Sequence, residues 1–198
     1  MSDSYAARSS SAADHPLHLT STDDLRRSRL TVFFRILLAI PHLIVLYVWT
    51  IGAEIAVVIA WFAGILLGRV PPGLHNFIAG YWRYRTRVTA YVLLLADPYP
   101  AFGSGPPYPI DLIVAPAATQ NRLTILFRII LAIPAAIVAN VLQNVAGIVA
   151  ILAWFYALFT GKANKGMRDL QAYCLRYQAQ THGYLLLLTQ RYPSFSDD

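Results

Sequence analysis

RLTVFFRILLAIP, residues 29–41, and RLTILFRIILAIP, residues 122–134, are nearly the same stretch written twice. A shift of 93 residues aligns 29–102 with 122–195 without a gap, and about 30 of those 74 positions are identical. Self-similarity at a fixed period indicates an internal duplication. We therefore expect one structural unit used twice, as repeat 1 (29–102) and repeat 2 (122–195).

The composition is that of a membrane protein. Of the 198 residues, 57% are hydrophobic and 13% are charged, and the mean hydropathy is +0.48, which is unusual for a soluble protein. Residues 30–68 contain only two charged residues, Arg35 and Glu54, and residues 123–161 contain only Arg128.

Each apolar stretch is too long for a single span. A helix of 39 residues would measure about 58 Å, against a hydrocarbon core of about 30 Å. We therefore expect each stretch to fold back as a hairpin, with turns near residues 50–53 and 143–146. The predicted fold is all-α, with four transmembrane helices arranged as two parallel hairpin repeats.

A third helix is expected in each repeat, over residues 74–96 and 167–189. Apolar residues recur there at a spacing of three and four, as in an amphipathic helix. Arg83, Arg85 and Arg87 make the first copy a poor span, because each central arginine costs about 2.5–3.5 kcal/mol. The helix is predicted to lie along the cytoplasmic membrane interface. The alternative, which periodicity does not separate, is a helix packed on the cytoplasmic ends of the spans.

The basic residues suggest an orientation. With two spans per repeat, both repeats begin and end on one side, and nearly all Lys and Arg residues fall on that side. The positive-inside rule then places both termini in the cytoplasm. Residues 1–28 are predicted to be a disordered cytoplasmic tail. Residues 103–121 are predicted to be a Gly/Pro-rich linker, in which the run IDLIV has no strand to pair with. The net charge of +6 indicates anionic lipid as a partner and not nucleic acid.

Arg35 and its counterpart Arg128 lie inside the apolar stretches. They could bind a lipid phosphate or a buried carboxylate such as Asp97 or Asp169, since guanidinium geometry suits both. They could also be anchors that snorkel to the headgroups. The candidate ligands of lipid headgroups are the paired arginines of the spans and of the third helices: Arg35, Arg128, Arg83 and Arg176.

Other chemically capable residues form no recognisable set. His42 and Glu54 have Ala135 and Gly147 as counterparts, so neither belongs to the duplicated scaffold, and they are predicted to be hydrogen-bonded or exposed. A single cysteine, Cys174, excludes an intramolecular disulfide. No metal-ligand, cofactor or nucleophile motif occurs.

The order of motifs resembles that of a known family. RLxxxFRIxLAIP, a Gly-basic turn, an amphipathic helix with adjacent Arg and Tyr, and YPxF occur in both repeats. In this the chain is similar to the bacterial membrane family catalogued as domain of unknown function 4389. The resemblance implies a multi-pass protein of the bacterial plasma membrane with tandem copies, and it implies no activity.

The function expected from these features is that of a membrane scaffold or accessory subunit, not an enzyme, which needs no cofactor or metal. Its partners would be anionic lipids and another protein or a second copy of the chain. The alternative is a small oligomeric transporter or channel, with Arg35, Arg128 and His42 along its path. A lipid-modifying enzyme using His42 or His182 has the least support.

Overall fold

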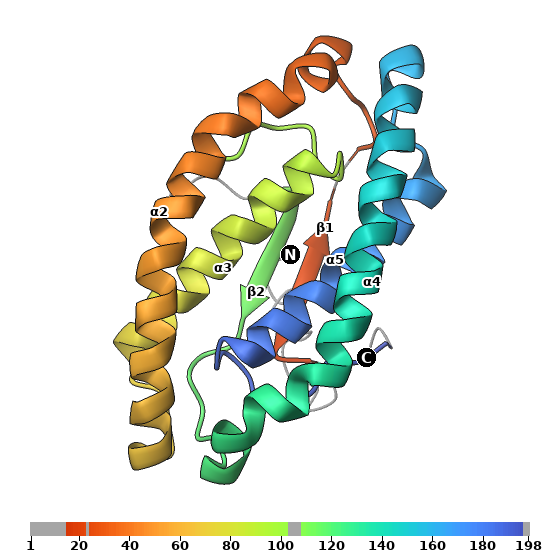
Figure 1. Cartoon of the computed structure of the whole chain (residues 1–198). Coiled ribbons are helices and arrows are strands. Elements are labelled where there is room, and N and C mark those ends of the chain that lie inside the picture. The colour runs from red at the N-terminus through yellow and green to blue at the C-terminus, as the bar shows by residue number, and fades with distance from the viewer. Residues whose placement is uncertain (1–14, 23, 103–107, 196–198) are drawn as a thin grey trace, which may run out of the picture.

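Each half of the molecule is built from a strand, a long helix and a shorter helix (Figure 1). The computed structural model describes residues 15–22, 24–102 and 108–195. In chain order the elements are β1 (Leu17–Ser21), α2 (Arg29–Leu67), α3 (Pro72–Val92), β2 (Ile110–Val114), α4 (Arg122–Thr160) and α5 (Lys165–Leu185). The duplicated unit therefore also includes a strand ahead of each long helix.

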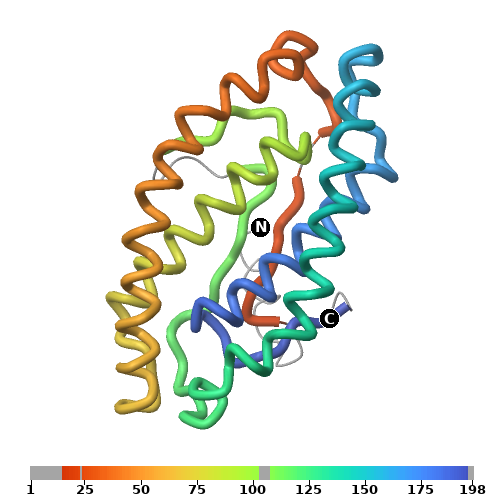
Figure 2. Tube along the Cα trace, viewed as in Figure 1, coloured from red at the N-terminus to blue at the C-terminus, as the bar shows by residue number. Residues whose placement is uncertain are grey.

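The two strands pair with each other and lie on an approximate twofold axis. β1 runs antiparallel to β2, with Leu19 opposite Leu112. These two residues are separated by the repeat offset of 93 positions, so equivalent residues face one another. Figure 2 shows the two halves related by rotation about the middle of this sheet.

The strands correct two expectations about the segments between the repeats. IDLIV forms β2 and does have a partner, the run LHLTS, which lies in the tail predicted to be disordered. Residues 1–14, 23 and 103–107 of the predicted tail and linker lie outside the described residues. A two-stranded pairing between distant segments escapes a search for local patterns, because neither strand has a neighbouring hairpin partner.

The predicted hairpins are wrong. α2 and α4 are each one continuous helix of 39 residues, and the expected turns at 50–53 and 143–146 lie inside them. Those positions hold no proline, and their turn-favouring residues, Gly52 and Asn144, lie inside the continuous helices. Each helix ends instead at a glycine in the left-handed conformation, Gly68 (φ 69°) and Gly161 (φ 70°), the usual helix-ending residue.

The repeats are antiparallel, which also differs from the prediction. The Trp61 indole near the end of α2 donates to the Ile125 carbonyl near the start of α4, at 3.0 Å. The equivalent Trp154 indole donates to the Val32 carbonyl at 2.8 Å. The start of each long helix therefore lies beside the end of the other. The tryptophan that makes this contact belongs to a run Ala-Trp-Phe (AWF) found in both repeats, at 60–62 and 153–155.

Basic residues consequently lie at both ends of the long helices and not on one side as predicted. At one end the backbones of Arg26 and Lys162 pair in an isolated β-bridge, close to the start of α2. At the other end Arg69 and Thr119 form the equivalent β-bridge, close to Arg122 at the start of α4.

The elements form three layers. β2 packs on α3 and β1 on α5, while α2 packs on α3 and α4 on α5. α3 and α5 are thus a middle layer between the sheet and the long helices. α3 packs along α2 from Arg35, which bonds the Tyr91 carbonyl, to Thr50, whose hydroxyl bonds that of Tyr81. The approach of α5 to the sheet is very close: a Cβ on Gly183 would lie 2.1 Å from Leu17 Cδ1.

The long helices bury one narrow stripe and expose the rest. On α2 the buried stripe recurs every three or four residues and includes Val32, Arg35 and Ala39. Around it stand exposed apolar side chains such as Leu30 (71%) and Leu66 (72%), at opposite ends of the helix. By length and composition both α2 and α4 could cross a membrane.

Candidate functional site

Arg35 is buried and holds the end of α3. Its side chain is 2% exposed. Its guanidinium donates to the Tyr91 carbonyl (2.7 Å), the Ala96 carbonyl (2.9 Å) and the Asp97 carboxylate (2.8 Å). It also stacks 4.5 Å from the centre of the Tyr91 ring. The guanidinium thus binds a carbonyl in the last turn of α3 and two groups of the segment that follows the helix.

Arg128 repeats the arrangement at the end of α5. It is 1% exposed and donates to the Tyr184 carbonyl, to the Thr189 carbonyl (3.0 Å) and to Gln120 Oε1 (2.6 Å). The guanidinium lies 4.5 Å from the Tyr184 ring centre. Of the two carboxylates suggested by the sequence, Asp97 does bind its arginine, whereas Asp169 pairs with Arg168 at 2.6 Å.

The two arginines therefore have a structural role, because each buried guanidinium ties its long helix to the end of the following helix. We call these two sets of contacts the arginine clasps. At both ends a leucine in the left-handed conformation follows the helix, Leu94 (φ 60°) and Leu187 (φ 63°). A second residue reaches the carbonyl of that leucine: Arg27 in repeat 1 (3.1 Å) and its counterpart Gln120 in repeat 2 (2.9 Å).

The structure does not bring the four candidate arginines into one site. Arg83 Nε donates to the Leu112 carbonyl of β2 at 3.0 Å. Arg176 donates to the Phe195 carbonyl at 3.2 Å. Arg35, Arg128 and His42, which the transporter alternative places along a path, are all buried.

His42 sits in an aromatic cluster. Its Nδ1 lies 2.6 Å from the Tyr84 hydroxyl, and its ring lies 4.5 Å from Tyr99 and 4.4 Å from Phe102. Burial, with a smaller contribution from Tyr99, raises the pKa of Tyr84 to about 12, so the hydroxyl keeps its proton in this hydrogen bond. The YPxF motif thus covers this histidine, and Glu54 is exposed elsewhere on α2.

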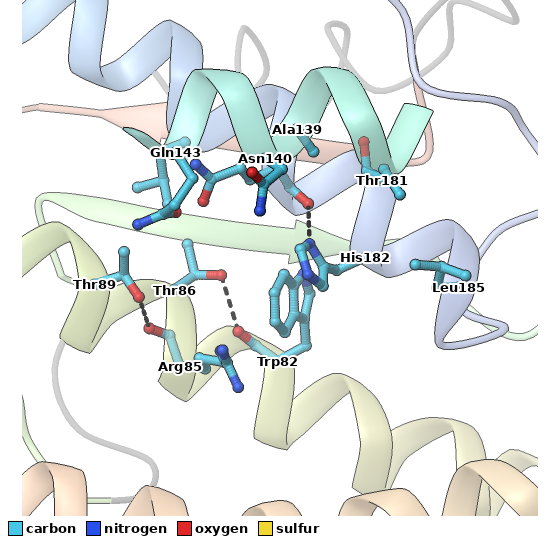
Figure 3. Close-up of a pocket in the computed structure, with 13 residues that line it drawn as sticks. Trp82, Arg85, Thr86, Thr89, Ala139, Asn140, Gln143, Thr181, His182 and Leu185 are labelled. Atoms are coloured by element: carbon cyan, nitrogen blue, oxygen red, sulfur yellow. Dashed lines mark hydrogen bonds between the residues drawn. The ribbon is translucent and has the colours of Figure 1, made fainter. Parts of the chain in front are cut away.

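A polar cavity of about 420 Å³ lies between α3, α4 and α5. Figure 3 shows Trp82, Arg85, Thr86 and Thr89 on α3 facing Asn140 and Gln143 on α4, with His182 of α5 between them. The Trp82 and His182 rings are stacked with centres 5.0 Å apart. The sequence singled out His182 but did not connect it with Arg85 or Asn140.

The α4 wall of the cavity differs from the equivalent part of α2 in side-chain size. α4 carries Ala136, Ala139 and Asn140 at the positions where α2 has Leu43, Leu46 and Tyr47. These smaller residues leave room beside α3 and α5. A comparison of the aligned repeats by side-chain size was the signal that could have found the cavity.

Cys174 is fully buried, and burial raises its thiol pKa, which keeps it in the inert protonated form. Within the described ranges, no group of three or more His, Cys, Asp or Glu side chains could hold a metal ion.

Comparison with known families assigns the chain. The profile described as Domain of unknown function (DUF4389) matches residues 29–104 and again 122–197. The two matches cover most of the chain, which therefore belongs to this family and carries two copies of its domain. No curated protein and no solved structure matches the chain significantly.

Proposed function

We propose that this DUF4389 protein is a non-catalytic membrane scaffold, in which α2 and α4 lie in the lipid of one leaflet, parallel to the membrane plane. In this orientation α3 and α5 are at the level of the headgroups, and the sheet faces the cytoplasm. The observation that carries the proposal is the exposed apolar surface of α2 and α4, which extends from end to end of both helices. Exposed polar side chains interrupt it only near the helix middles, at Glu54, Asn140, Gln143 and Asn144 among the described residues.

That surface is too extensive for a chain surrounded by water. On α4 it reaches from Leu123 (66% exposed) through Ile137 (61%) to Phe159 (74%). Soluble monomers rarely expose contiguous apolar patches beyond a few hundred Å². Lipid is the solvent that removes the cost of exposing it, because transfer of apolar surface out of water is favourable.

The length of the helices favours the in-plane orientation over a crossing. A helix of 39 residues is about 58 Å long, almost twice the hydrocarbon thickness of about 30 Å. A crossing would also place the middle of the molecule at the bilayer midplane. Arg83, Arg85 and Asp111 lie there, and central charges are costly, by about 2.5–3.5 kcal/mol for each arginine.

The middle layer has the composition of a headgroup zone. Arg85 of α3 and Tyr173 and Arg176 of α5 are at least partly exposed, and tyrosine rings and arginine side chains favour this depth. Tyr81 and Trp82 are buried inside the protein. With the helices in plane, the basic residues at both ends reach the same leaflet. The in-plane orientation therefore accounts for basic residues at both ends of the helices, and it favours the anionic, cytoplasmic leaflet as their location.

Cysteine labelling in intact cells and inverted vesicles tests the orientation. Single cysteines replace Arg69 and Lys162, at opposite ends of the long helices, in a chain with Cys174→Ala. We expect a membrane-impermeant maleimide to modify both from the cytoplasmic side only. Labelling of one from each side would show that the helices cross, and release of the chain by alkaline carbonate would remove the membrane scaffold altogether.

A further inference from the structure

We propose that the cavity between α3, α4 and α5 binds the headgroup of an anionic glycerophospholipid, with Arg85 holding the phosphate. The inference rests on the proposed function, since it requires that α2 and α4 lie in lipid. It assigns the ligand to Arg85, and not to Arg35, Arg128, Arg83 or Arg176.

The cavity has the size of a small-molecule site. Its volume of about 420 Å³ falls within the roughly 300–1,000 Å³ of ordinary ligand pockets. Of its α4 lining, Asn140 and Gln143 are exposed, so the cavity opens along this helix. Beside them Ile137 (61%) and Val141 (57%) expose apolar side chains, along which acyl chains would leave the site for the leaflet.

Two donors in the cavity suit a phosphate. Arg85 is exposed and gives one N–H to the Tyr81 hydroxyl (2.8 Å), which orients the guanidinium while other N–H groups remain for a ligand. Gln178 is 6% exposed and its Nε2 has no acceptor in the protein. A buried amide without a partner is costly, and a phosphate oxygen would satisfy it.

The hydroxyl groups of the lining do not compete as donors. Thr86 donates to the Trp82 carbonyl at 2.9 Å and Thr89 to the Arg85 carbonyl at 2.8 Å. The phosphate is therefore left to Arg85 and the side-chain amides.

His182 adds one acceptor for a ligand hydroxyl. Its Nδ1 lies 3.0 Å from the Gln178 carbonyl, which can only accept, so Nδ1 carries the proton. Burial lowers the pKa of His182, so at neutral pH the ring is uncharged and Nε2 is an acceptor. A phosphodiester with a neighbouring glycerol hydroxyl satisfies both the donors and this acceptor.

The charge of the lining selects among headgroups. Arg85 is the charged residue among those described around the cavity, and none of them is Asp or Glu. A choline or ethanolamine headgroup would bring a cation with no carboxylate to meet it. Phosphatidylglycerol, anionic and rich in hydroxyls, has the chemistry that fits.

The test is binding of short-chain phosphatidylglycerol and phosphatidylcholine to the full, delipidated chain in mild detergent, measured by native mass spectrometry. We expect phosphatidylglycerol to bind at least tenfold more tightly, and Arg85→Gln to weaken it by about tenfold or more, as for loss of a charged hydrogen bond. Arg176→Gln, a matched control with the same charge change on α5, should leave binding within about twofold.

A second variant covers the case in which Arg85→Gln misfolds. Ala139→Leu places the repeat 1 residue into the cavity and should abolish the preference for phosphatidylglycerol. Equal losses in Arg85→Gln and Arg176→Gln, or unchanged binding in Ala139→Leu, would overturn the site.

Binding of soluble glycerol 3-phosphate as tight as that of the lipid would overturn the lipid assignment. If the chain stays in membranes but shows no headgroup preference, only this inference fails; if it leaves them, the proposed function fails.

Discussion

Replacing Arg128 with methionine tests whether the buried arginines are structural clasps. The change removes a donor from three acceptors, the carbonyls of Tyr184 and Thr189 and the side chain of Gln120. The Tyr184 carbonyl keeps the Leu187 N–H as a donor, whereas each buried acceptor left without a donor costs about 1–3 kcal/mol. The lost contact with the Tyr184 ring adds about 0.5–2 kcal/mol.

Removal of the buried guanidinium also returns part of its desolvation cost. The net loss expected from breaking such a buried set is therefore about 3–5 kcal/mol. At about 2–4 °C per kcal/mol for a chain of this size, the melting temperature should fall by roughly 6–20 °C. Arg128→Lys should recover only part of the loss, because an ammonium lacks the planar fork that reaches several acceptors.

The assay is thermal unfolding followed by circular dichroism in detergent, with bound lipid quantified on the same samples. Arg168→Met is the matched control, because it removes the same charge from an exposed pair with Asp169, for which about 0–1 kcal/mol is expected. If Arg128→Met melted like Arg168→Met but lost its anionic lipid, Arg128 would be a lipid ligand and the clasp interpretation would be refuted.

Three further predictions follow from close contacts and burial. Gly183→Ala should destabilise the chain by about 1–3 kcal/mol, because its Cβ would meet Leu17 at 2.1 Å in a packed core. Gly147→Ala is the control: its Cβ meets nothing within 4 Å, so it should stabilise α4 by up to about 1 kcal/mol. Thermal unfolding curves that shifted in the same direction for both variants would contradict this prediction. Burial lowers the pKa of His15 from 6.5 to about 4, so as pH falls the unfolded chain binds a proton before the folded one does, and up to about 3 kcal/mol of stability should be lost between about pH 6.5 and 4. His15→Gln should make this decline shallower, and an unchanged slope would refute the assignment. Trp154→Phe removes the hydrogen bond to the Val32 carbonyl and should cost about 1 kcal/mol of stability. Trp61→Phe should cost the same at the other end of the helices, and the two losses should add in the double variant because the sites are distant. A double variant whose loss differed strongly from the sum would count against two independent contacts.

Much of the architecture followed from the sequence. The gap-free repeat predicted two equivalent units, and apolar periodicity predicted a long apolar segment and an amphipathic helix in each. These features are local, because helix formation depends on residues three and four positions apart. The left-handed glycines Gly68 and Gly161 close the long helices, at the Gly-basic turn that the sequence shows in each repeat.

The wrong predictions, the hairpins and the parallel repeats, concern features that depend on long-range contacts or on the surroundings of the helices. The hairpins were inferred from bilayer thickness, an argument that holds only if a helix lies across the membrane. Each AWF tryptophan is repeated in sequence, but only the fold shows that Trp61 and Trp154 bind the opposite long helix and so make the repeats antiparallel. A duplicated sequence does not specify whether its copies are related by a parallel or an antiparallel axis.

The sequence by itself determined that this chain is an apolar, duplicated helical protein with an arginine at one fixed place in each copy. Only the tertiary structure decided what surrounds that arginine: carbonyls at the end of the following helix, more than 50 residues away in the chain. It also brought Arg85, Gln178 and His182 to one cavity. The physical reason is that periodicity specifies which side of a helix is buried, whereas the groups that meet there depend on how distant helices pack.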